Sequence, residues 1–190
     1  MPNLRGQLLE NAPLAEYSSW QVGGPAQRLY KPADSHDLIN FIKTLAAEEP
    51  LIFLGMGSNT LERDGGIKGT VVITQGALNQ LKCLDPVTLY AEAGVASPAL
   101  ARFAARKNLT GAEFLAGIPG TIGGALAMNA GCSGCETWNI VKSVITLNRH
   151  GEKKTRFPSE YEIAYRQVSV FPDEYYLAAH FQLEPGAKEK

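Results

Sequence analysis

Two glycine-rich stretches carry the residue types that most clearly indicate ligand binding. The first is Gly55-Met56-Gly57-Ser58-Asn59, and the second runs through Gly117-Ile118-Pro119-Gly120-Thr121-Ile122-Gly123-Gly124 to Asn129 and Gly131. Because glycine costs folding entropy, such runs need a reason, and consecutive N–H groups free of Cβ atoms form a concave surface that suits phosphate oxygens. Asn59 and Asn129 can each donate and accept hydrogen bonds. Either stretch alone could be a tight turn, but the two together favour a ligand with an extended diphosphate.

Neither stretch matches a standard nucleotide-binding fingerprint. Thr60 stands where the last glycine of a G-x-G-x-x-G pattern belongs, and the sequence has no G-x-x-x-x-G-K-[ST] pattern. A doubly wound dehydrogenase and a P-loop enzyme are therefore not expected.

Metal and thiol chemistry have weaker support. Cys132-Ser133-Gly134-Cys135 is a C-x-x-C pattern, but the chain has only three cysteines and its three histidines are scattered. No second C-x-x-C completes a metal site. We expect no metal, and we favour small packed residues over a catalytic dithiol.

Composition limits the classes of partner. The chain has 190 residues, 45% of them hydrophobic and 19% charged, and a formal net charge of −1. This balance gives no reason to expect nucleic acid or an acidic membrane surface as a partner. The sequence has no apolar run of the roughly 20 residues that span a bilayer, and its start does not resemble a signal peptide. We therefore expect a cytoplasmic protein.

Residues 1–76 are expected to form a small α/β unit that positions the first stretch. The pattern predicts a strand at 28–31, a helix from Asp34 or Ser35 to Glu48, and strands at 51–54 and 70–73. The run at 51–54 is entirely apolar, as is typical of a strand buried on both faces. It leads directly into Gly55, at the carboxyl end of a strand, where open α/β sheets bind ligands.

Residues 77–185 are expected to form an α+β unit with antiparallel pairing, followed by a polar tail at 186–190. Ser97 is the expected cap of a helix that ends at Lys107, with Pro98 at its first position. The short helix at 121–128 would place the second stretch at its amino end, which attracts anions. The other predicted elements are a half-buried strand at 87–92, a hairpin of 142–148 with 153–157, and a final strand at 175–183.

These motifs, in this order, resemble the UDP-N-acetylenolpyruvoylglucosamine reductases, which are flavoenzymes of peptidoglycan precursor synthesis. The stretch from Ser18 to Ala26 is similar to the family's T-S-F-x-V-G-G-P-A. The stretch from Gly117 to Gly131 is similar to its G-I-P-G-[ST]-[IV]-G-G-A…M-N-A-G. Other matching segments are Gly55–Asn59, Asp64–Gly69 and Tyr165-Arg166.

The resemblance implies a vanillyl-alcohol-oxidase (PCMH-type) FAD-binding fold of class α+β, with two subdomains and non-covalent FAD between them. These subdomains would be the small α/β unit and a mixed or antiparallel sheet with helices. The resemblance also implies that NADPH donates a hydride and that a UDP-linked amino sugar with an enolpyruvyl ether is reduced to UDP-N-acetylmuramate.

The resemblance also implies roles for individual residues. The loop formed by Gly55, Met56, Gly57, Ser58 and Asn59 would hold the FAD diphosphate from one side. The residues that would hold it from the other side are Ile118, Pro119, Gly120, Thr121, Gly123 and Gly124.

Four further residues are implied to lie at the flavin. Asn129 and Gly131 would lie near it, and Tyr165 would lie beside it. Arg166 would be catalytic, because a fixed guanidinium stabilises the charge that develops toward the substrate carboxylate. A surface ion pair is the alternative for Arg166.

The chain departs from the family pattern at three places. Val168 stands where the family has Ser, with Ser169 one position later, and Cys132 and Cys135 stand where small residues are usual. The family's third domain, with a proton-donating Ser in a G-S-[FV]-F context and a late Glu, has no counterpart among these residues. The expectation is the FAD-binding part of the reductase, with the third domain missing in cis or supplied in trans. A catalytically silent flavin-binding module that acts through a partner, and another oxidase of the same fold, remain alternatives.

Overall fold

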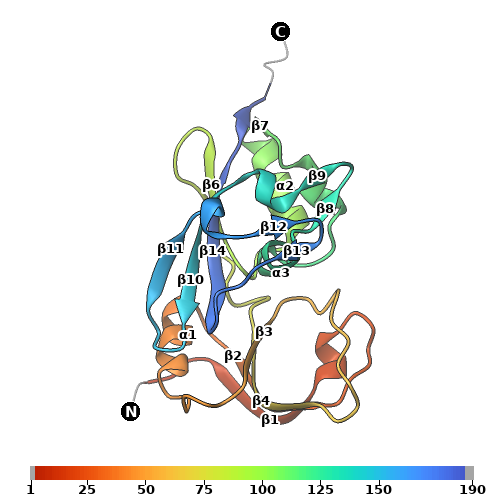
Figure 1. The fold of residues 1–190 in the computed structure, drawn as a ribbon, viewed down its shortest axis with the longest axis vertical. Helices are drawn as coiled ribbons and strands as arrows, with labels where there is room; N and C mark the ends of the chain where they lie inside the picture. Colours follow the sequence, from red (N-terminus) through yellow and green to blue (C-terminus); the bar gives the residue numbers. More distant parts are fainter. Residues whose placement is uncertain (1–2, 187–190) are drawn as a thin grey trace.

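The computed structural model describes residues 3–186 and contains two main β-sheets, one above the other along the long axis of the molecule (Figure 1). The first sheet has the strand order β1-β2-β4-β3, and the second has the order β11-β10-β14-β6-β5. The strands of the first sheet are β1 (Gln7–Pro13), β2 (Pro25–Lys31), β3 (Leu51–Leu54) and β4 (Ile67–Ile73). The strands of the second sheet are β5 (Leu81–Cys83), β6 (Thr88–Glu92), β10 (Val141–Asn148), β11 (Lys153–Arg156) and β14 (Glu174–Gln182).

Short strand pairs and helices complete the chain. The helices are α1 (Ser35–Ile42), α2 (Ser97–Arg106) and α3 (Ile122–Met128), with 3-10 turns η1 (Leu14–Tyr17), η2 (Glu113–Gly117), η3 (Thr137–Asn139) and η4 (Pro158–Glu160). The paired short strands are β7 (Leu109–Thr110) with β15 (Glu184–Pro185), β8 (Gly131–Cys132) with β9 (Cys135–Glu136), and β12 (Ile163–Ala164) with β13 (Gln167–Val168).

The first sheet is an α/β arrangement that delivers the first glycine stretch to one edge. Strands β2 and β3 both run parallel to β4, which lies between them, and α1 connects them. Asp34 caps α1 by accepting a hydrogen bond from the N–H of Asp37. The cap expected from the sequence is therefore confirmed.

The helix α1 is shorter than predicted. It ends at Ile42 instead of Glu48, and the next N–H groups make three-residue turns, from Thr44 to the carbonyl of Phe41 and from Leu45 to that of Ile42. The hydroxyl of Thr44 also donates to the Phe41 carbonyl at 2.6 Å. A threonine hydroxyl that competes for a backbone carbonyl favours the end of a helix, which explains the difference.

Two strands differ from prediction in burial. Strand β3 is an edge strand, and Ile52 is 39% exposed, so the prediction that this run is buried on both faces is wrong. Strand β6 was expected to be half-buried, but it lies between β5 and β14, and only Tyr90 within it is partly exposed. In both cases the burial depends on the strand order, which local sequence does not contain.

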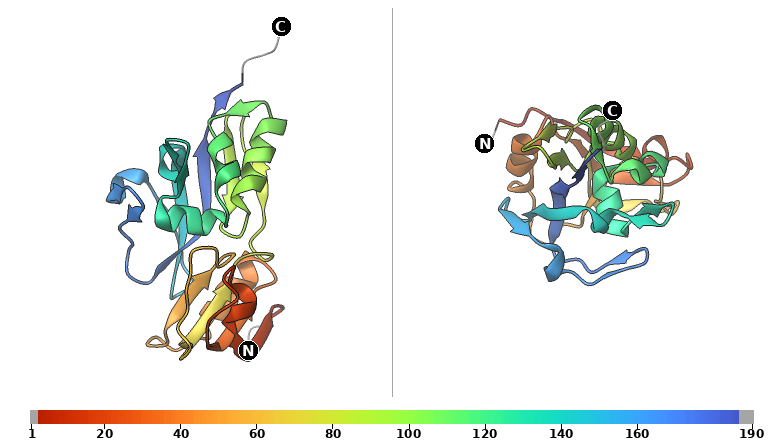
Figure 2. Two further views of the ribbon diagram at one scale, coloured as in Figure 1. Left: turned by 90° about the vertical axis from the view of Figure 1, so that its right-hand side faces the viewer. Right: turned by 90° about the horizontal axis from the view of Figure 1, so that it is seen from above.

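Helices α2 and α3 cover one face of the second sheet (Figure 2). The prediction that Ser97 caps α2 is wrong by one position, because Ala96 is the cap. The N–H of Ser97 donates to the carbonyl of Gly120 at 3.0 Å, so the start of α2 is tied to the second glycine stretch. The Ser97 hydroxyl is buried and has no partner within residues 3–186.

The remaining predicted elements of this half are confirmed. Strands β10 and β11 form the expected hairpin, and β14 is the expected last long strand. In the expected tail, the N–H of Gly186 donates to the carbonyl of Asn108, and positions 187–190 lie outside the described residues.

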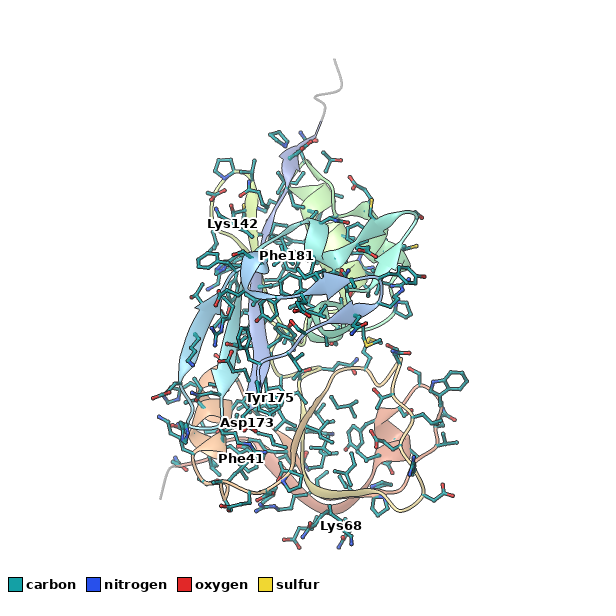
Figure 3. All side chains as sticks on the ribbon, in the orientation of Figure 1. Phe41, Lys68, Lys142, Asp173, Tyr175 and Phe181 are labelled. Carbon is teal, nitrogen blue, oxygen red and sulfur yellow. The ribbon has the colours of Figure 1, made fainter. Side chains whose placement is uncertain are left out.

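A shared core joins the two sheets. Phe41 of α1 and Val72 of β4 pack in one cluster with Leu147 of β10 and Leu177 of β14. Tyr175 lies at the end of β14 nearest the first sheet and packs against this cluster (Figure 3). The hydroxyl of Tyr175 donates to the carbonyl of Leu51 at 3.1 Å, so the two sheets are fixed relative to each other by apolar and polar contacts.

Candidate functional site: a cleft between two glycine loops

A cleft of about 810 Å³ lies where the end of β3 faces the chain before α3. We call residues 55–59 the first glycine loop and residues 117–124 the second. The site residues predicted from the sequence that line the cleft are Gly55, Met56, Gly57, Ser58, Asn59, Ile118, Pro119, Gly120, Thr121, Gly123, Gly124, Gly131 and Arg166. Asn129 and Tyr165 are not among the residues that line it.

The two loops touch each other directly. The hydroxyl of Ser58 donates to the carbonyl of Pro119 at 3.1 Å. Gly55 packs against the side chain of Thr121 so closely that a Cβ there would overlap the Thr121 hydroxyl. Segments more than 60 residues apart in sequence therefore form one continuous surface.

Backbone conformation requires glycine at one position in each loop. Gly57 has φ +60°, and a Cβ there would collide with the backbone of Tyr17. Gly120 has φ +125°, and a Cβ there would lie 2.9 Å from the hydroxyl oxygen of Ser58. Both conformations are rare for residues with side chains.

Several backbone donors in the loops have no partner in the protein. Within residues 3–186, no carbonyl or side chain accepts from the N–H groups of Gly57, Gly120 or Thr121, although all three residues are buried. The N–H groups of Ser58 and Asn59 are likewise without a partner in this part of the chain. Buried backbone donors are nearly always paired in folded proteins, so these groups indicate a ligand with hydrogen-bond acceptors.

The amino end of α3 supplies fewer donors than expected. The N–H groups of Ile122 and Gly123 donate to the carbonyls of Val95 and Ala93, both at 2.8 Å. The helix begins one residue later than predicted, at Ile122, because Thr121 is its cap, and the Thr121 hydroxyl accepts from the N–H of Gly124. The N–H groups of the first helical turn thus already donate to acceptors in the protein. The expectation that this helix end attracts an anion is corrected. The unpaired donors lie in the loop before it.

An aromatic wall, which the sequence analysis did not anticipate, closes another side of the cleft. Phe53 of β3 stacks on Tyr175 of β14, with ring centroids 4.5 Å apart, and Tyr176 also lines the cleft. The alternation of β14 predicted its strand but not the wall, because the partner ring comes from the first sheet. The wall adds an apolar surface beside the polar loops.

Charged groups in the cleft are few. Glu174 is the one carboxyl among the described lining residues. Hydrogen bonds from Arg156, foremost, and from Thr146 lower its pKa, so this carboxylate stays ionised near neutral pH. Arg156 approaches its oxygens at 2.6 and 3.1 Å. A paired, ionised carboxylate is a poor proton donor.

Arg166 reaches the cleft from the tip of the β12–β13 hairpin. Its backbone is left-handed, with φ +56°, and its guanidinium donates to the carbonyl of Gly131 at 2.8 Å. Within residues 3–186 this is its one hydrogen bond, and no carboxylate pairs with it, so the surface ion pair considered as an alternative is not formed there. The remaining donors of the guanidinium are free for an anionic ligand.

Two predicted residues have other surroundings. Asn129 is fully buried in a left-handed conformation; its amide donates to Glu136 and to the Ala164 carbonyl, and its oxygen accepts from the N–H of Trp138. These bonds join α3 to the hairpin that carries Arg166. Tyr165 is 78% exposed and lies outside the cleft lining.

Ser169 does not face the cleft as a free hydroxyl. Its oxygen accepts from the N–H of Glu162 at 2.8 Å, and its own N–H donates to the Glu162 carbonyl. These two bonds close the base of the β12–β13 hairpin, and Ser169 is not among the residues that line the cleft.

The part of the chain that the structure describes, residues 3–186, offers neither a cluster of metal ligands nor a membrane-spanning helix. No group of three or more His, Cys, Asp or Glu side chains is placed to hold a metal ion. No helix there is both long and apolar enough to cross a membrane.

Comparisons with known proteins agree with this geometry. UDP-N-acetylenolpyruvoylglucosamine reductase of Legionella pneumophila (strain Corby) is 56% identical over 185 residues, which are 97% of this chain and 60% of that protein. The reductase of Methylococcus capsulatus is 52% identical over 182 residues, 96% of this chain and 60% of that protein. The chain therefore spans about 60% of the length of these curated relatives.

Solved structures show the fold. The crystal structure of UDP-N-acetylenolpyruvylglucosamine reductase from Thermus caldophilus aligns with a TM-score of 0.75 at 28% identity, covering 97% of this chain and 64% of that one. Cholesterol oxidase from Brevibacterium sterolicum aligns with a TM-score of 0.66 at 17% identity, covering 97% of this chain and 39% of that one. The predicted α+β class and the PCMH-type FAD-binding fold are thus confirmed.

A family model described as "FAD binding domain" matches residues 26–155, which include both glycine loops. This match spans more than half of the chain, so FAD is the cofactor of this fold. The chain belongs to the family of FAD binding domains.

Proposed function

We propose that this chain is the FAD-binding part of a UDP-N-acetylenolpyruvoylglucosamine reductase. In this proposal NADPH donates the hydride, and the enolpyruvyl ether of a UDP-linked amino sugar is reduced to UDP-N-acetylmuramate. The reductases of Legionella pneumophila and Methylococcus capsulatus, at 56% and 52% identity, support this choice of substrate. The cytoplasmic location and the absence of nucleic-acid, membrane and metal partners remain predictions.

The observation that carries the proposal is the set of unpaired backbone donors in the two glycine loops. Gly57, Ser58 and Asn59 would hold the FAD diphosphate from one side, and Gly120 and Thr121 from the other. The absence of Cβ atoms at the two glycines lets phosphate oxygens approach the backbone. Phe53 and Tyr175 offer an apolar surface for a ring system, and no covalent attachment is proposed. We further propose that Ile118, Pro119, Gly123, Gly124 and Gly131 complete the contact surface.

When bound in this cleft, FAD would supply hydride transfer between NADPH and the substrate. The residue of this chain with the clearest role in that reaction is Arg166. Its guanidinium lines the cleft and is held at one corner by the Gly131 carbonyl, so its other donors can bind the substrate carboxylate in a fixed orientation. Negative charge that develops toward this carboxylate is then stabilised without reorganisation.

Two units of the chain would form the cleft, and neither would supply the proton for the reaction. We propose that residues 1–76 and 77–185 are its two subdomains, each supplying one glycine loop. The lining residues contain one carboxyl, Glu174, which is paired and ionised. We therefore propose that the proton donor belongs to the part of the reductase that the curated relatives have beyond the 60% matched here.

A second function, a flavin-binding module without catalysis of its own, is favoured by that same lack of an unpaired carboxyl among the described lining residues. The two functions differ in the behaviour of bound FAD. A reductase part should let NADPH bleach the flavin absorbance, whereas a silent module should leave it unchanged.

The direct test is thermal unfolding of the full chain with FAD, compared with riboflavin, which has the same ring system but no diphosphate. A ligand that binds only the native state at a hundredfold excess over its Kd adds about 2.7 kcal/mol of stability. We expect FAD to raise the melting temperature and riboflavin to have little effect at equal concentration. No shift with FAD would refute the proposal, and equal shifts would refute the role of the glycine loops.

A further inference from the structure

The β8–β9 hairpin places two cysteines opposite each other. Strands β8 and β9 are antiparallel, with Cys132 paired to Cys135 and Gly131 paired to Glu136. Ser133 and Gly134 connect them, with φ +54° and +82°. Positive φ at both central residues is the signature of the tight two-residue turn that fits a β-hairpin. The C-x-x-C pattern is thus built into a hairpin with a fixed register.

This register brings the Cα atoms of the two cysteines into the range that a disulfide spans. Opposed residues that flank a two-residue turn exchange backbone hydrogen bonds, with Cα atoms about 5.5 Å apart. Opposed side chains also lie on the same face of the hairpin. A disulfide needs Cα atoms roughly 4.4–6.8 Å apart, most often about 5.5–6 Å. Cys132 and Cys135, which are both free thiols here, are an opposed pair of this kind, and a small approach of their Cβ atoms, to about 3.5–4.5 Å, closes the bond.

The sulfur atoms of the two cysteines differ in their exposure to solvent. Cys135 is exposed, and the turn residues Ser133 and Gly134 are exposed beside it. Cys132 is half-buried, and its sulfur lies against the second glycine loop, since a Cβ on Gly117 would be 2.7 Å from it. A metal does not explain the pair, because no third ligand of the His, Cys, Asp or Glu kind joins it within the described residues.

We propose that Cys132 and Cys135 form a reversible disulfide, a thiol-oxidation site at the border of the cleft, whose oxidant is a small-molecule disulfide such as oxidised glutathione. The thiolate of exposed Cys135 attacks one sulfur of oxidised glutathione, forms a mixed disulfide and releases one glutathione thiolate. Cys132 then loses its proton and attacks the Cys135 sulfur, which forms the Cys132–Cys135 bond and releases the second glutathione. Two protein thiols are oxidised and one glutathione disulfide is reduced to two thiols.

The site lies next to groups that the cleft uses. The carbonyl of Gly131, adjacent to Cys132, holds the guanidinium of Arg166, and the Cys132 sulfur rests on Gly117 of the second glycine loop. The disulfide would fix the end of the hairpin that holds both contacts. The proposal itself does not depend on the substrate of the enzyme.

Thiol counting on the full chain tests the proposal. The chain is incubated with oxidised glutathione, quenched with acid, unfolded, and alkylated with a maleimide before mass spectrometry. We expect three labels before oxidation and one afterwards, on Cys83, in a monomer that has lost two hydrogens and carries no glutathione. Reduction with a dithiol should restore three labels.

Two variants provide matched controls. Cys83→Ser should go from two labels to none, and Cys135→Ser should keep a label on Cys132 after the same treatment. Three persistent labels would overturn the proposal, as would a stable glutathione adduct on Cys135 with Cys132 still free. A disulfide-linked dimer in place of the intramolecular bond would also overturn it.

Discussion

The two asparagines of the glycine-rich stretches have the same side chain but opposite surroundings. Asn59 is exposed at the cleft and makes no side-chain hydrogen bond within residues 3–186, whereas Asn129 is buried and uses its amide in three. From the sequence alone, both asparagines were predicted to contact the ligand, because the hydrogen-bond partners of Asn129 lie 7 to 35 residues further along the chain. The structure separates a candidate ligand contact from a fold-stabilising residue.

This difference predicts opposite phenotypes for two alanine variants. Asn59→Ala should leave the melting temperature of the FAD-free chain unchanged but weaken FAD binding about three- to tenfold, the value of one hydrogen bond. Asn129→Ala should lower the free energy of unfolding by about 1–3 kcal/mol, because it leaves buried partners unpaired. Urea unfolding and FAD titration of both variants measure the two effects. Wild-type FAD affinity in the Asn59→Ala variant would mean that the first loop is a tight turn without a role in FAD binding.

Gly120 provides a second prediction at the scale of a residue. Gly120→Ala forces a side chain into φ +125° and places a Cβ against Ser58, so the contact between the loops must shift. Such strain costs about 1–3 kcal/mol, and we expect FAD affinity to fall about tenfold or more. Gly65→Ala is the matched control, since a Cβ there meets no atom within 4 Å. Equal FAD affinity in the two variants would contradict the assigned role of the second loop.

Among the elements, those defined by local signals followed the sequence closely. Asp34, one of the two expected caps, does cap α1, because a side-chain oxygen one turn before an N–H needs no distant partner. The position of β3 at the exposed edge of the sheet was not predicted, since it depends on β4 pairing between β2 and β3. The aromatic wall was missed for the same reason: Phe53 and Tyr175 come from different sheets.

The contact between α1 and the first sheet predicts a pH dependence of stability. Asp37 is 1% exposed and accepts hydrogen bonds from Tyr30 at 2.7 Å, from the N–H of Arg5 at 2.7 Å and from that of Ala33 at 2.9 Å. Burial opposes ionisation of the carboxyl, but these bonds outweigh burial and lower its pKa. Burial, followed by the hydrogen bond to Asp37, raises the pKa of the Tyr30 hydroxyl to about 12.

Because the pKa of Asp37 is lower in the folded state, its contribution is present above the pKa of the unfolded chain, about 3.9. The contribution is lost as the pH falls through the folded-state value. We expect Asp37→Asn to cost about 1–3 kcal/mol at pH 7 and the difference from wild type to shrink below about pH 4. Glu10→Gln, on exposed β1, should stay within about 0.5 kcal/mol at both pH values. A difference for Asp37→Asn that stays constant with pH would contradict this account.

At the scale of the molecule, the cleft joins surfaces from both sheets and offers no unpaired carboxyl among its described lining residues. Both glycine loops, the aromatic wall and Arg166 surround it, yet its one carboxyl among the described lining residues is already paired. The shared core packs the two sheets against each other, and Ser58 and Pro119 join the two loops directly. Cofactor binding and full catalysis should therefore be separable in these 190 residues.

This separation gives the last prediction. The isolated chain should let NADPH reduce bound FAD slowly, because that step needs only a bound and accessible flavin. Reduction of the enolpyruvyl substrate also needs a general acid, which typically contributes about 10²- to 10⁴-fold in rate. We therefore expect little or no substrate turnover, and Arg166→Ala should abolish what remains while FAD affinity stays near wild type. Stopped-flow flavin absorbance measures the first step, and substrate-dependent NADPH oxidation measures the second. Full turnover by the isolated chain would mean that one of its own residues donates the proton, although Glu174 is already paired and Ser169 is not among the residues that line the cleft.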